Sequence, residues 1–320
     1  MWSEMPAGDL ALGLPSSLEG RGLIMGYGRT PITPGRYLED SLRNLGVRVD
    51  VSETEVDFAE VDPRACAAVL FVESPSRPQV KVKNIHLASV PRLFWVHHGV
   101  NRWQDNLGLC GRYRPDLMLL SGVLYLASLF PVPVHFFPFA AASWIFNSSK
   151  PLAGRGHDIS FAGTVRSHLY ATRLETLRAT EARFKARFKL SLRSNVYLED
   201  LATLYGDSKI VVNCSADLFG HGLNLRVFEA MACGALLVTD KVLDFEKLFR
   251  DGEHCVVYDD IPDLLDKLEH YLTHLDEAQA IASRGHEVVL EKHTYADRAR
   301  EVLGLIARVA DERALGNTAR

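Results

Sequence analysis

The chain has 320 residues, of which 47% are hydrophobic and 24% are charged, and its formal net charge is −4. This composition suits a soluble globular protein with room for two domains of ~150 residues each. The slight excess of acidic residues argues against a general nucleic-acid-binding protein, which usually carries a basic face. The five cysteines include no C-x-x-C pair, so the sequence favours a reducing cytoplasm and excludes a disulfide framework or a zinc site.

Short apolar stretches alternate with helical stretches in the first half of the chain. A helix is expected from Pro34 to about Leu45, between the first two apolar stretches. The expected strands cover residues 23–25, 47–51, 67–72, 92–96, 116–120 and 134–137. This alternation predicts an α/β fold with a parallel sheet covered by helices on both faces.

One segment, residues 123–146, is almost wholly apolar and calls for a check for a membrane span. Pro131, Pro133 and Pro138 would break a single spanning helix. We expect instead a short helix over residues 124–130, the strand at 134–137, and no transmembrane span. Residues 1–20 lack a basic region followed by an apolar core, so no secretory signal is expected there.

The strand–helix pattern restarts after a polar connector over residues 147–156. The expected strands are 158–163, 188–192, 209–213, 235–238 and 255–258, and the expected helices are 168–184, 198–205, 262–274, 277–292 and 295–309. A charged, frayed tail is expected from Asp311. The sequence thus predicts two tandem doubly wound domains, at 1–146 and 147–303, followed by a helix end and tail at 304–320. Ligands should bind in the cleft between the carboxyl ends of the two sheets.

The most informative segment, residues 219–240, is a glycine-containing turn that leads into an amphipathic helix and a second apolar strand. Arg226 lies in the first helical turn, where the helix dipole favours anions, so this cation calls for an anion such as a diphosphate. Glu229 either forms an i, i+3 ion pair with Arg226 or accepts two ribose hydroxyls. Asn224 is a helix cap first and a ligand second, and Gly222 allows either a close backbone approach or a sharp turn.

A second loop at the same sheet edge carries Gly163, Thr164 and Arg166. Thr164 is either a cap of the following helix or a ligand contact, and Arg166 would place a second cation near a departing diphosphate. The predicted donor and nucleotide site therefore comprises Gly163, Thr164, Arg166, Gly222, Asn224, Leu225, Arg226 and Glu229.

Two features of the first half lie at its sheet edge. Gly28 and Arg29 follow the first strand and form a candidate acceptor-side loop, and the absence of a third glycine at the required spacing rejects dinucleotide binding. His97 and His98 end the fourth strand. They are either solvated or capped imidazoles, or groups that contact the sugar or transfer a proton near neutral pH.

Five blocks in the second half resemble, in order, the C-terminal domain of the CgeB-like glycosyltransferases, which belong to the group-1 glycosyltransferases of GT-B fold. The blocks are residues 158–164, 213–217, 222–235, 248–253 and 293–298. The resemblance covers residues 157–303. It implies a GT-B-like α/β architecture, with two tandem Rossmann-like doubly wound domains and an interdomain cleft, and a nucleotide sugar held by the second domain. It also implies that neither a metal nor any cofactor besides the nucleoside diphosphate sugar is needed.

The family's Glu-x7-Glu motif maps onto His221 and Glu229. The resemblance implies that Glu229 holds the nucleotide ribose, whereas the donor-sugar contact falls to His221 in place of the first glutamate. His97, His98 and His221 are accordingly the candidate catalytic residues. The C-terminal helix of such folds often returns to the first domain, and residues 295–309 are the candidate.

The sequence therefore predicts a cytoplasmic, metal-independent glycosyltransferase that moves a sugar from a nucleoside diphosphate donor to an unknown acceptor. The acceptor is a saccharide, a small molecule, a lipid or a protein, and no nucleic-acid partner is expected. Two alternatives stay open: a sugar-nucleotide epimerase of similar architecture, and a degenerate non-catalytic binding protein. The second is favoured by His221, which replaces the first glutamate of the family's motif.

Overall fold

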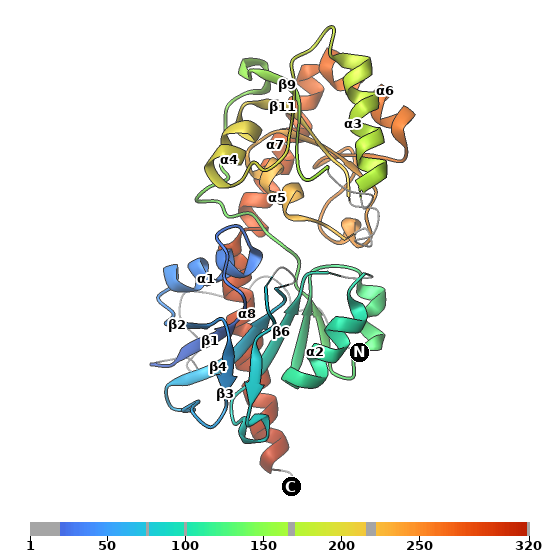
Figure 1. The fold of residues 1–320 in the computed structure, drawn as a ribbon. Coiled ribbons are helices and arrows are strands. Elements are labelled where there is room, and N and C mark those ends of the chain that lie inside the picture. The colour runs from blue at the N-terminus through green and yellow to red at the C-terminus, as the bar shows by residue number, and fades with distance from the viewer. Residues whose placement is uncertain (1–19, 75–76, 99–100, 166–169, 216–221, 319–320) are drawn as a thin grey trace.

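The computed structural model describes residues 20–74, 77–98, 101–165, 170–215 and 222–318. Two α/β domains are stacked along the long axis of the molecule, and the last helix runs along the first domain (Figure 1). Candidate residues Arg166 and His221 lie outside the described residues.

The first domain contains a six-stranded sheet in the order β2-β1-β4-β6-β7-β8, and each of its strand pairs is parallel. Its strands are β1 (Gly22–Gly26), β2 (Val49–Ser52), β4 (Cys66–Val72), β6 (Arg92–Val96), β7 (Leu117–Leu120) and β8 (Val134–Phe136). The central strands β4 and β7 are buried along their whole length. Continuous apolar runs form such strands because helices cover both faces of a parallel sheet. The expected first-half strands are thus confirmed.

Other elements of the first domain include two that the sequence pattern did not reveal. Helix α1 (Pro34–Asn44) was expected, whereas helix α2 (Trp103–Tyr113) and the small parallel pair β3 (Glu55–Asp57) and β5 (Lys81–Lys83) were not. The expected helix at 124–130 is a 3-10 helix, Leu124–Leu129. No helix among the described residues is long and apolar enough to cross a membrane.

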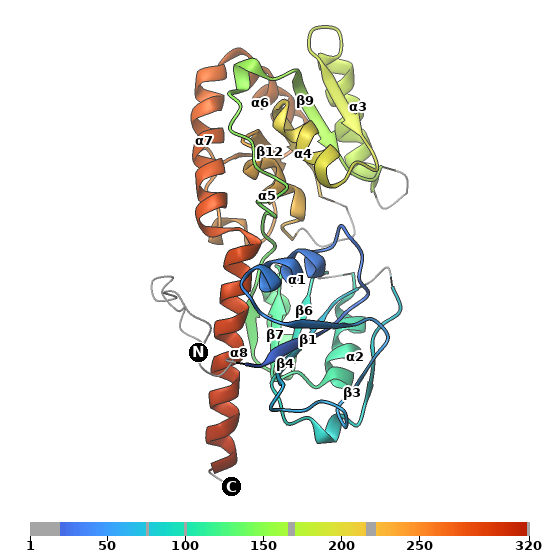
Figure 2. The same cartoon turned by 90° about the vertical axis from the view of Figure 1, so that its left-hand side faces the viewer.

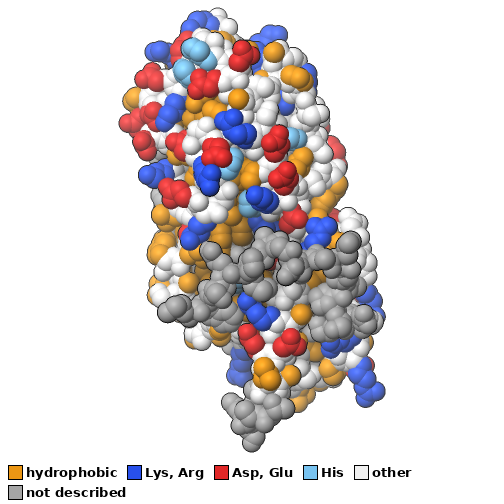
Figure 3. Space-filling view, turned by 180° about the vertical axis from the view of Figure 1, so that it is seen from behind, with side chains coloured by type: hydrophobic (Ala, Val, Ile, Leu, Met, Phe, Trp, Pro, Cys, Tyr) orange, Lys and Arg blue, Asp and Glu red, His pale blue; other side chains and the backbone are white. Residues whose placement is uncertain are grey.

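The second domain contains a five-stranded parallel sheet in the order β10-β9-β11-β12-β13. Its strands are β9 (His157–Ala162), β10 (Leu190–Arg193), β11 (Ser208–Asn213), β12 (Leu236–Asp240) and β13 (Val256–Tyr258). Its helices are α3 (Ala171–Phe184), α4 (Leu198–Gly206), α5 (Leu225–Ala232), α6 (Ile261–Thr273) and α7 (Leu275–Lys292). Acidic and basic side chains are interspersed over this domain on the face in Figure 3.

Helix α8 (Tyr295–Thr318) returns to the first domain and packs along it (Figure 2). The two chain crossings between the domains are hydrogen-bonded to each other: Ala141 N–H donates to the His293 carbonyl at 2.8 Å, and Tyr295 N–H donates to the Ala141 carbonyl at 3.0 Å. The frayed tail expected from Asp311 is wrong, because α8 continues to Thr318. Its last turns are held by Arg313, which pairs with Asp116 at 2.8 Å.

Candidate functional site

A cleft of about 380 Å³ lies between the two domains, at the carboxyl ends of both sheets. The first domain contributes residues that follow β6 and β7, and the second contributes residues that follow β9 and β11. The lining residues are His97, His98, Ser121, Gly122, Val123, Phe139, Gly163, Thr164, Tyr170, Arg173, Ser215, Gly222, Leu223, Asn224 and Arg226. We call the lining residues of each domain the first-domain lip and the second-domain lip of the cleft. The two lips approach each other closely, since a Cβ added to Gly122 would lie 3.6 Å from the Cα of Gly222.

Helix α5 points its N-terminus into this cleft, and Asn224 caps it. The Asn224 Oδ1 accepts the Arg226 backbone N–H at 3.1 Å, and its Nδ2 donates to Asn213 Oδ1 at 3.2 Å. The predicted cap is confirmed. Because a helix N-terminus leaves other backbone N–H groups unpaired within the helix, this lip of the cleft favours an anion. Leu225, the first residue of α5, packs partly buried against the core instead of lining the cleft.

The Arg226 guanidinium lines the cleft and lies over the Phe161 ring, 5.6 Å from its centroid. Its Nε donates to Asn224 Oδ1 at 3.2 Å and its Nη1 to the Ala162 carbonyl at 3.3 Å. Gly163 makes room for it, because a Cβ there would lie only 2.6 Å from Arg226 Nη1. Arg226 can thus occupy this position only because the residue after β9 is a glycine.

A second guanidinium, that of Arg173 in the first turn of α3, lines the same cleft and was missed by the sequence analysis. Its Nε and Nη2 donate to the Cys214 carbonyl at 3.1 and 2.9 Å, and its Nη1 donates to the Thr164 carbonyl at 2.7 Å. Only 3% of the residue is exposed. Burial, and next the positive charge of Arg226, lower the pKa of the Arg173 guanidinium. The sequence signal that could have identified Arg173 is a basic residue in the first turn of the helix that follows β9.

Neither guanidinium forms an ion pair with a carboxylate among the described residues; both donate to neutral oxygens. Burying a cation without an acid is unfavourable unless another negative group can approach it. The open side of both arginines is the cleft. This pair of cations at a helix N-terminus therefore makes the second-domain lip an anion site.

Glu229 occupies a different place from Arg226. It is 5% exposed and does not line the cleft. In place of the i, i+3 ion pair with Glu229, the Arg226 guanidinium donates to Asn224 Oδ1 and to the Ala162 and Cys214 carbonyls. Burial raises the pKa of the Glu229 carboxyl to about 7, and the charge of Arg226 opposes the rise. Burial, followed by this carboxylate, also raises the pKa of Tyr37 on α1, so Glu229 lies beside the first domain. Its contact with a ribose stays a prediction.

On the first-domain lip, the two predicted histidines both line the cleft. The His97 ring packs edge-on against Trp95 at 4.4 Å and against Phe139 at 5.3 Å between ring centroids. Its Nε2 is buried and has no hydrogen-bond partner in the described part of the chain. Burial lowers the pKa of His97 to about 3, so this imidazole is neutral at physiological pH.

A buried carboxylate that the sequence analysis missed, Glu73, holds the histidine turn. One oxygen, Oε2, accepts the backbone N–H groups of His97 at 2.6 Å and His98 at 2.8 Å. The other, Oε1, lies 3.4 Å from His98 Nδ1 and 3.3 Å from Arg102 Nε. Burial alone would raise the pKa of Glu73, but the hydrogen bond and charge of His98 bring it below its usual value. The sequence signal that could have identified Glu73 is an acidic residue directly after the seven apolar residues of β4.

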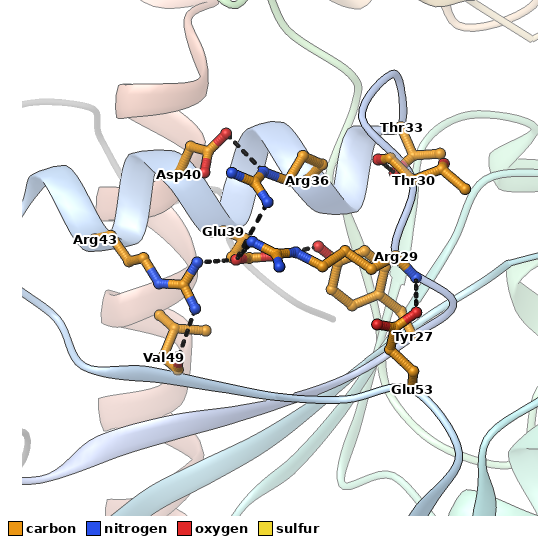
Figure 4. A network of polar contacts seen from close by, with 10 residues as sticks. All are labelled: Tyr27, Arg29, Thr30, Thr33, Arg36, Glu39, Asp40, Arg43, Val49 and Glu53. Atoms are coloured by element: carbon orange, nitrogen blue, oxygen red, sulfur yellow. Dashed lines mark hydrogen bonds and ion pairs between the residues drawn. The ribbon is translucent and has the colours of Figure 1, made fainter.

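The predicted acceptor-side loop does not line the described cleft. A Cβ on Gly28 would lie 2.3 Å from the Cβ of Arg77, so this glycine permits close packing of two loops. The Arg29 guanidinium pairs with buried Glu39 at 2.8 Å, in a network that also includes Tyr27, Arg36 and Arg43 (Figure 4). An acceptor contact at Gly28 and Arg29 stays a prediction. Among the described residues, no group of three or more His, Cys, Asp or Glu side chains could hold a metal ion.

Solved structures share this architecture of two parallel-sheet domains with a cleft between them. A glycosyltransferase from Rickettsia africae ESF-5 superposes with a TM-score of 0.64 at 11% identity, covering 90% of this chain and 98% of that one. Sucrose-phosphate synthase from Thermosynechococcus elongatus gives 0.63 at 12% identity, covering 90% and 99%. Anabaena HepE, in complex with UDP and glucose, gives 0.60 at 9% identity, covering 90% and 100%. The chain has the GT-B fold.

The sequence of the second domain supplies the narrower finding. Residues 151–304 match the family described as glycosyl transferase-like. The match covers the second domain, which is therefore similar to that family. The CgeB-like subgroup stays a prediction. No curated protein matches the chain in sequence.

Proposed function

We propose that the protein transfers a sugar from a nucleoside diphosphate sugar to an acceptor, without a metal ion. The observation that carries this proposal is the pair of guanidinium groups, Arg173 and Arg226, which face the cleft at the start of α3 and α5 with no carboxylate partner in the described residues. A diphosphate would supply the missing negative charge.

The chemistry of sugar transfer places its main demand on this lip of the cleft. When the bond between the anomeric carbon and the phosphate oxygen breaks, negative charge develops on that oxygen. Two fixed cations and the N-terminus of α5 stabilise this charge because they are positioned before the reaction begins. Metal independence is part of the proposal, since the arginines take the role that a cation would have in binding the diphosphate.

The remaining donor contacts follow the sequence predictions. Gly163, Thr164, Gly222 and Asn224 line the cleft around the arginines. We assign Glu229 to the ribose, Leu225 to the packing of the helix start, and Arg166 and His221 to the diphosphate and the donor sugar. His97 and His98, across the cleft, contact the sugar or the acceptor. Gly28 and Arg29 belong to the acceptor-side domain.

Binding of nucleotides tests the proposal directly. UDP is the first ligand to use, because the Anabaena neighbour is in complex with UDP and glucose. Calorimetry should detect UDP binding to the wild-type protein, and Arg226→Gln should weaken it at least tenfold. A hydrogen bond to a charged group is worth about 1.5–3 kcal/mol, and 1.4 kcal/mol is tenfold in affinity.

Arg183→Gln makes the same change of side chain and is the control, since the Arg183 side chain is 52% exposed and lies outside the cleft. This variant should bind UDP as the wild type does. If neither UDP nor GDP, dTDP or ADP binds to the wild type, the proposed function is wrong. Incubation with UDP-glucose alone separates the epimerase, which would yield an isomeric sugar nucleotide, from the transferase, which would release UDP.

A further inference from the structure

The two guanidinium groups of the second-domain lip share one aromatic ring. The guanidinium carbon of Arg226 lies over the Phe161 ring at 5.6 Å from its centroid, and that of Arg173 lies over the same ring at 5.7 Å. Both distances are within the ~6 Å at which a cation is attracted to the negative face of an aromatic ring. Phe161 is only 1% exposed and does not line the described cleft, so it cannot touch a bound donor.

The position of this ring follows from the strand that carries it. Phe161 and Ile159 of β9 belong to one apolar cluster, whereas Ala162 belongs to another, because successive side chains of a strand point to opposite faces. The strand ends at Ala162 and Gly163 follows. A Cβ added to Gly163 would lie 2.9 Å from Phe161 Cζ and 2.6 Å from Arg226 Nη1. The tip of the ring, the glycine and the guanidinium thus meet at the carboxyl edge of the sheet.

Both guanidinium groups need a stabilising neighbour before a diphosphate binds. Burial, and next the charge of Arg226, lower the pKa of Arg173, so the two cations repel each other. The Cys214 carbonyl accepts N–H groups from both arginines. The face of the Phe161 ring adds a further attraction and carries no net charge. A carboxylate in the same place would also hold the arginines, but it would compete with the diphosphate for them.

We propose that Phe161 is a positioning residue of the diphosphate site, whose ring holds Arg173 and Arg226 as cations and leaves their charge for the donor. This proposal rests on the proposed function. Of the five N–H groups of each guanidinium, three donate to protein oxygens in the described part of the chain. Two on each arginine are left for phosphate oxygens, and the ring restricts how far they can move.

A second ring, that of Tyr170, distinguishes the two arginines. The Arg173 guanidinium carbon lies 4.5 Å from the Tyr170 centroid, so Arg173 contacts two rings. Among the rings of the described residues, Phe161 is the one over which Arg226 lies. Loss of the Phe161 ring should therefore displace Arg226 more than Arg173.

Fluorination of the ring tests the electrostatic part of this role. We choose 3,5-difluorophenylalanine in place of Phe161, because it weakens the negative face of the ring but adds no atom at Cζ, where the ring meets Gly163. Calorimetry should show UDP binding weakened at least threefold, since two buried cations lie over this ring. A merely structural ring would fill the same space and keep the wild-type affinity, and that result would overturn the proposal.

Phe184 provides the matched control. It is fully buried in the same apolar cluster as Phe161, and it also lies below an arginine, Arg187, at 5.9 Å. Neither Phe184 nor Arg187 lines the described cleft. The same fluorinated residue at position 184 should therefore leave UDP affinity unchanged, and an equal loss at both positions would contradict the proposal.

Removal of the ring tests whether Phe161 acts through Arg226. Phe161→Leu keeps an apolar side chain and should weaken UDP binding at least tenfold, whereas Phe184→Leu should not change it. In the Arg226→Gln background, Phe161→Leu should weaken binding by a smaller factor, because only Arg173 still lies over the ring. An equal factor in both backgrounds would overturn the proposal. If Phe161→Leu does not fold, the fluorinated variant decides the question.

The wild type separates this proposal from the proposed function. A wild type that binds UDP, together with a fluorinated Phe161 variant that binds it equally well, refutes the role of Phe161 and leaves the proposed function standing. A wild type that binds no nucleotide refutes both, because the ring would then have no diphosphate site to support.

Discussion

The substitution Gly163→Ala tests whether the position of the Arg226 guanidinium matters to the anion site. An added Cβ would lie 2.6 Å from Arg226 Nη1 and 2.9 Å from Phe161 Cζ, whereas 3.4 Å is the lower bound of ordinary contact. The guanidinium must therefore move by about 0.8 Å, since 3.4 − 2.6 = 0.8, which exceeds the ~0.5 Å within which a binding group must be held. Its bond to the Ala162 carbonyl, 3.3 Å long, lies on the same side and would be lost.

We expect Gly163→Ala to weaken UDP binding by at least tenfold, since the contact between arginine and phosphate is worth about 1.5–3 kcal/mol. The loss in unfolding free energy should be smaller, about 1 kcal/mol, because the long arginine side chain can turn aside. Calorimetry with UDP and urea unfolding measure the two effects. Gly108→Ala on α2, where an added Cβ meets nothing within 4 Å, is the control and should keep the wild-type affinity. An unchanged UDP affinity in folded Gly163→Ala would refute the reasoning.

Two further predictions concern stability. Glu229→Gln should raise the unfolding free energy at pH 8 but not at pH 4, because burial raises the pKa of this carboxyl from 4.5 to about 7. Between pH 4.5 and 7 the folded protein holds a proton that the unfolded chain has released, so the wild-type unfolding free energy falls as pH rises, by roughly 3 kcal/mol at most. An equal increase in the unfolding free energy of Glu229→Gln at both pH values, measured by urea unfolding, would contradict this. Arg155→Met should lower stability by about 3 kcal/mol or more, because Arg155 is 5% exposed and bonds four backbone carbonyls. The exposed control Arg178→Met should change it by less than about 0.5 kcal/mol.

Local sequence patterns predicted those parts of the fold whose signal is contained in a short window. Apolar runs bounded by polar residues identified the central strands, such as β4 and β11. Helix α2 escaped because it contains Gly108 and Gly111, which lower helix propensity. The three-residue strands β3 and β5 are too short to show a period. The end of α8 reads as a charged tail, and only its contact with Asp116, far away in the chain, makes its helical packing intelligible.

The same division applies to the candidate site. The Asn224 cap follows from a local rule and was found. The reason for a glycine at position 163 was not predicted, because the guanidinium of Arg226, which occupies the space of a Cβ there, is distant in sequence. Glu73 reaches the histidine turn from the end of a neighbouring strand, an arrangement that sheet order alone determines. Whether Glu229 faces the cleft or the first domain depends on the rotation of α5, which its amphipathic pattern leaves open.

The two lips of the cleft differ in charge, and this difference suits the proposed reaction. The second-domain lip carries two cations without a carboxylate partner in the described residues, while on the first-domain lip the charge of Glu73 is matched by Arg102 and His97 is neutral. In the proposed reaction, negative charge moves to the diphosphate oxygen as its bond to the anomeric carbon breaks. That charge develops beside the two guanidinium groups and the N-terminus of α5, so it is stabilised in the transition state more than in the bound donor. An acid placed between Arg173 and Arg226 would remove this advantage before the donor arrived.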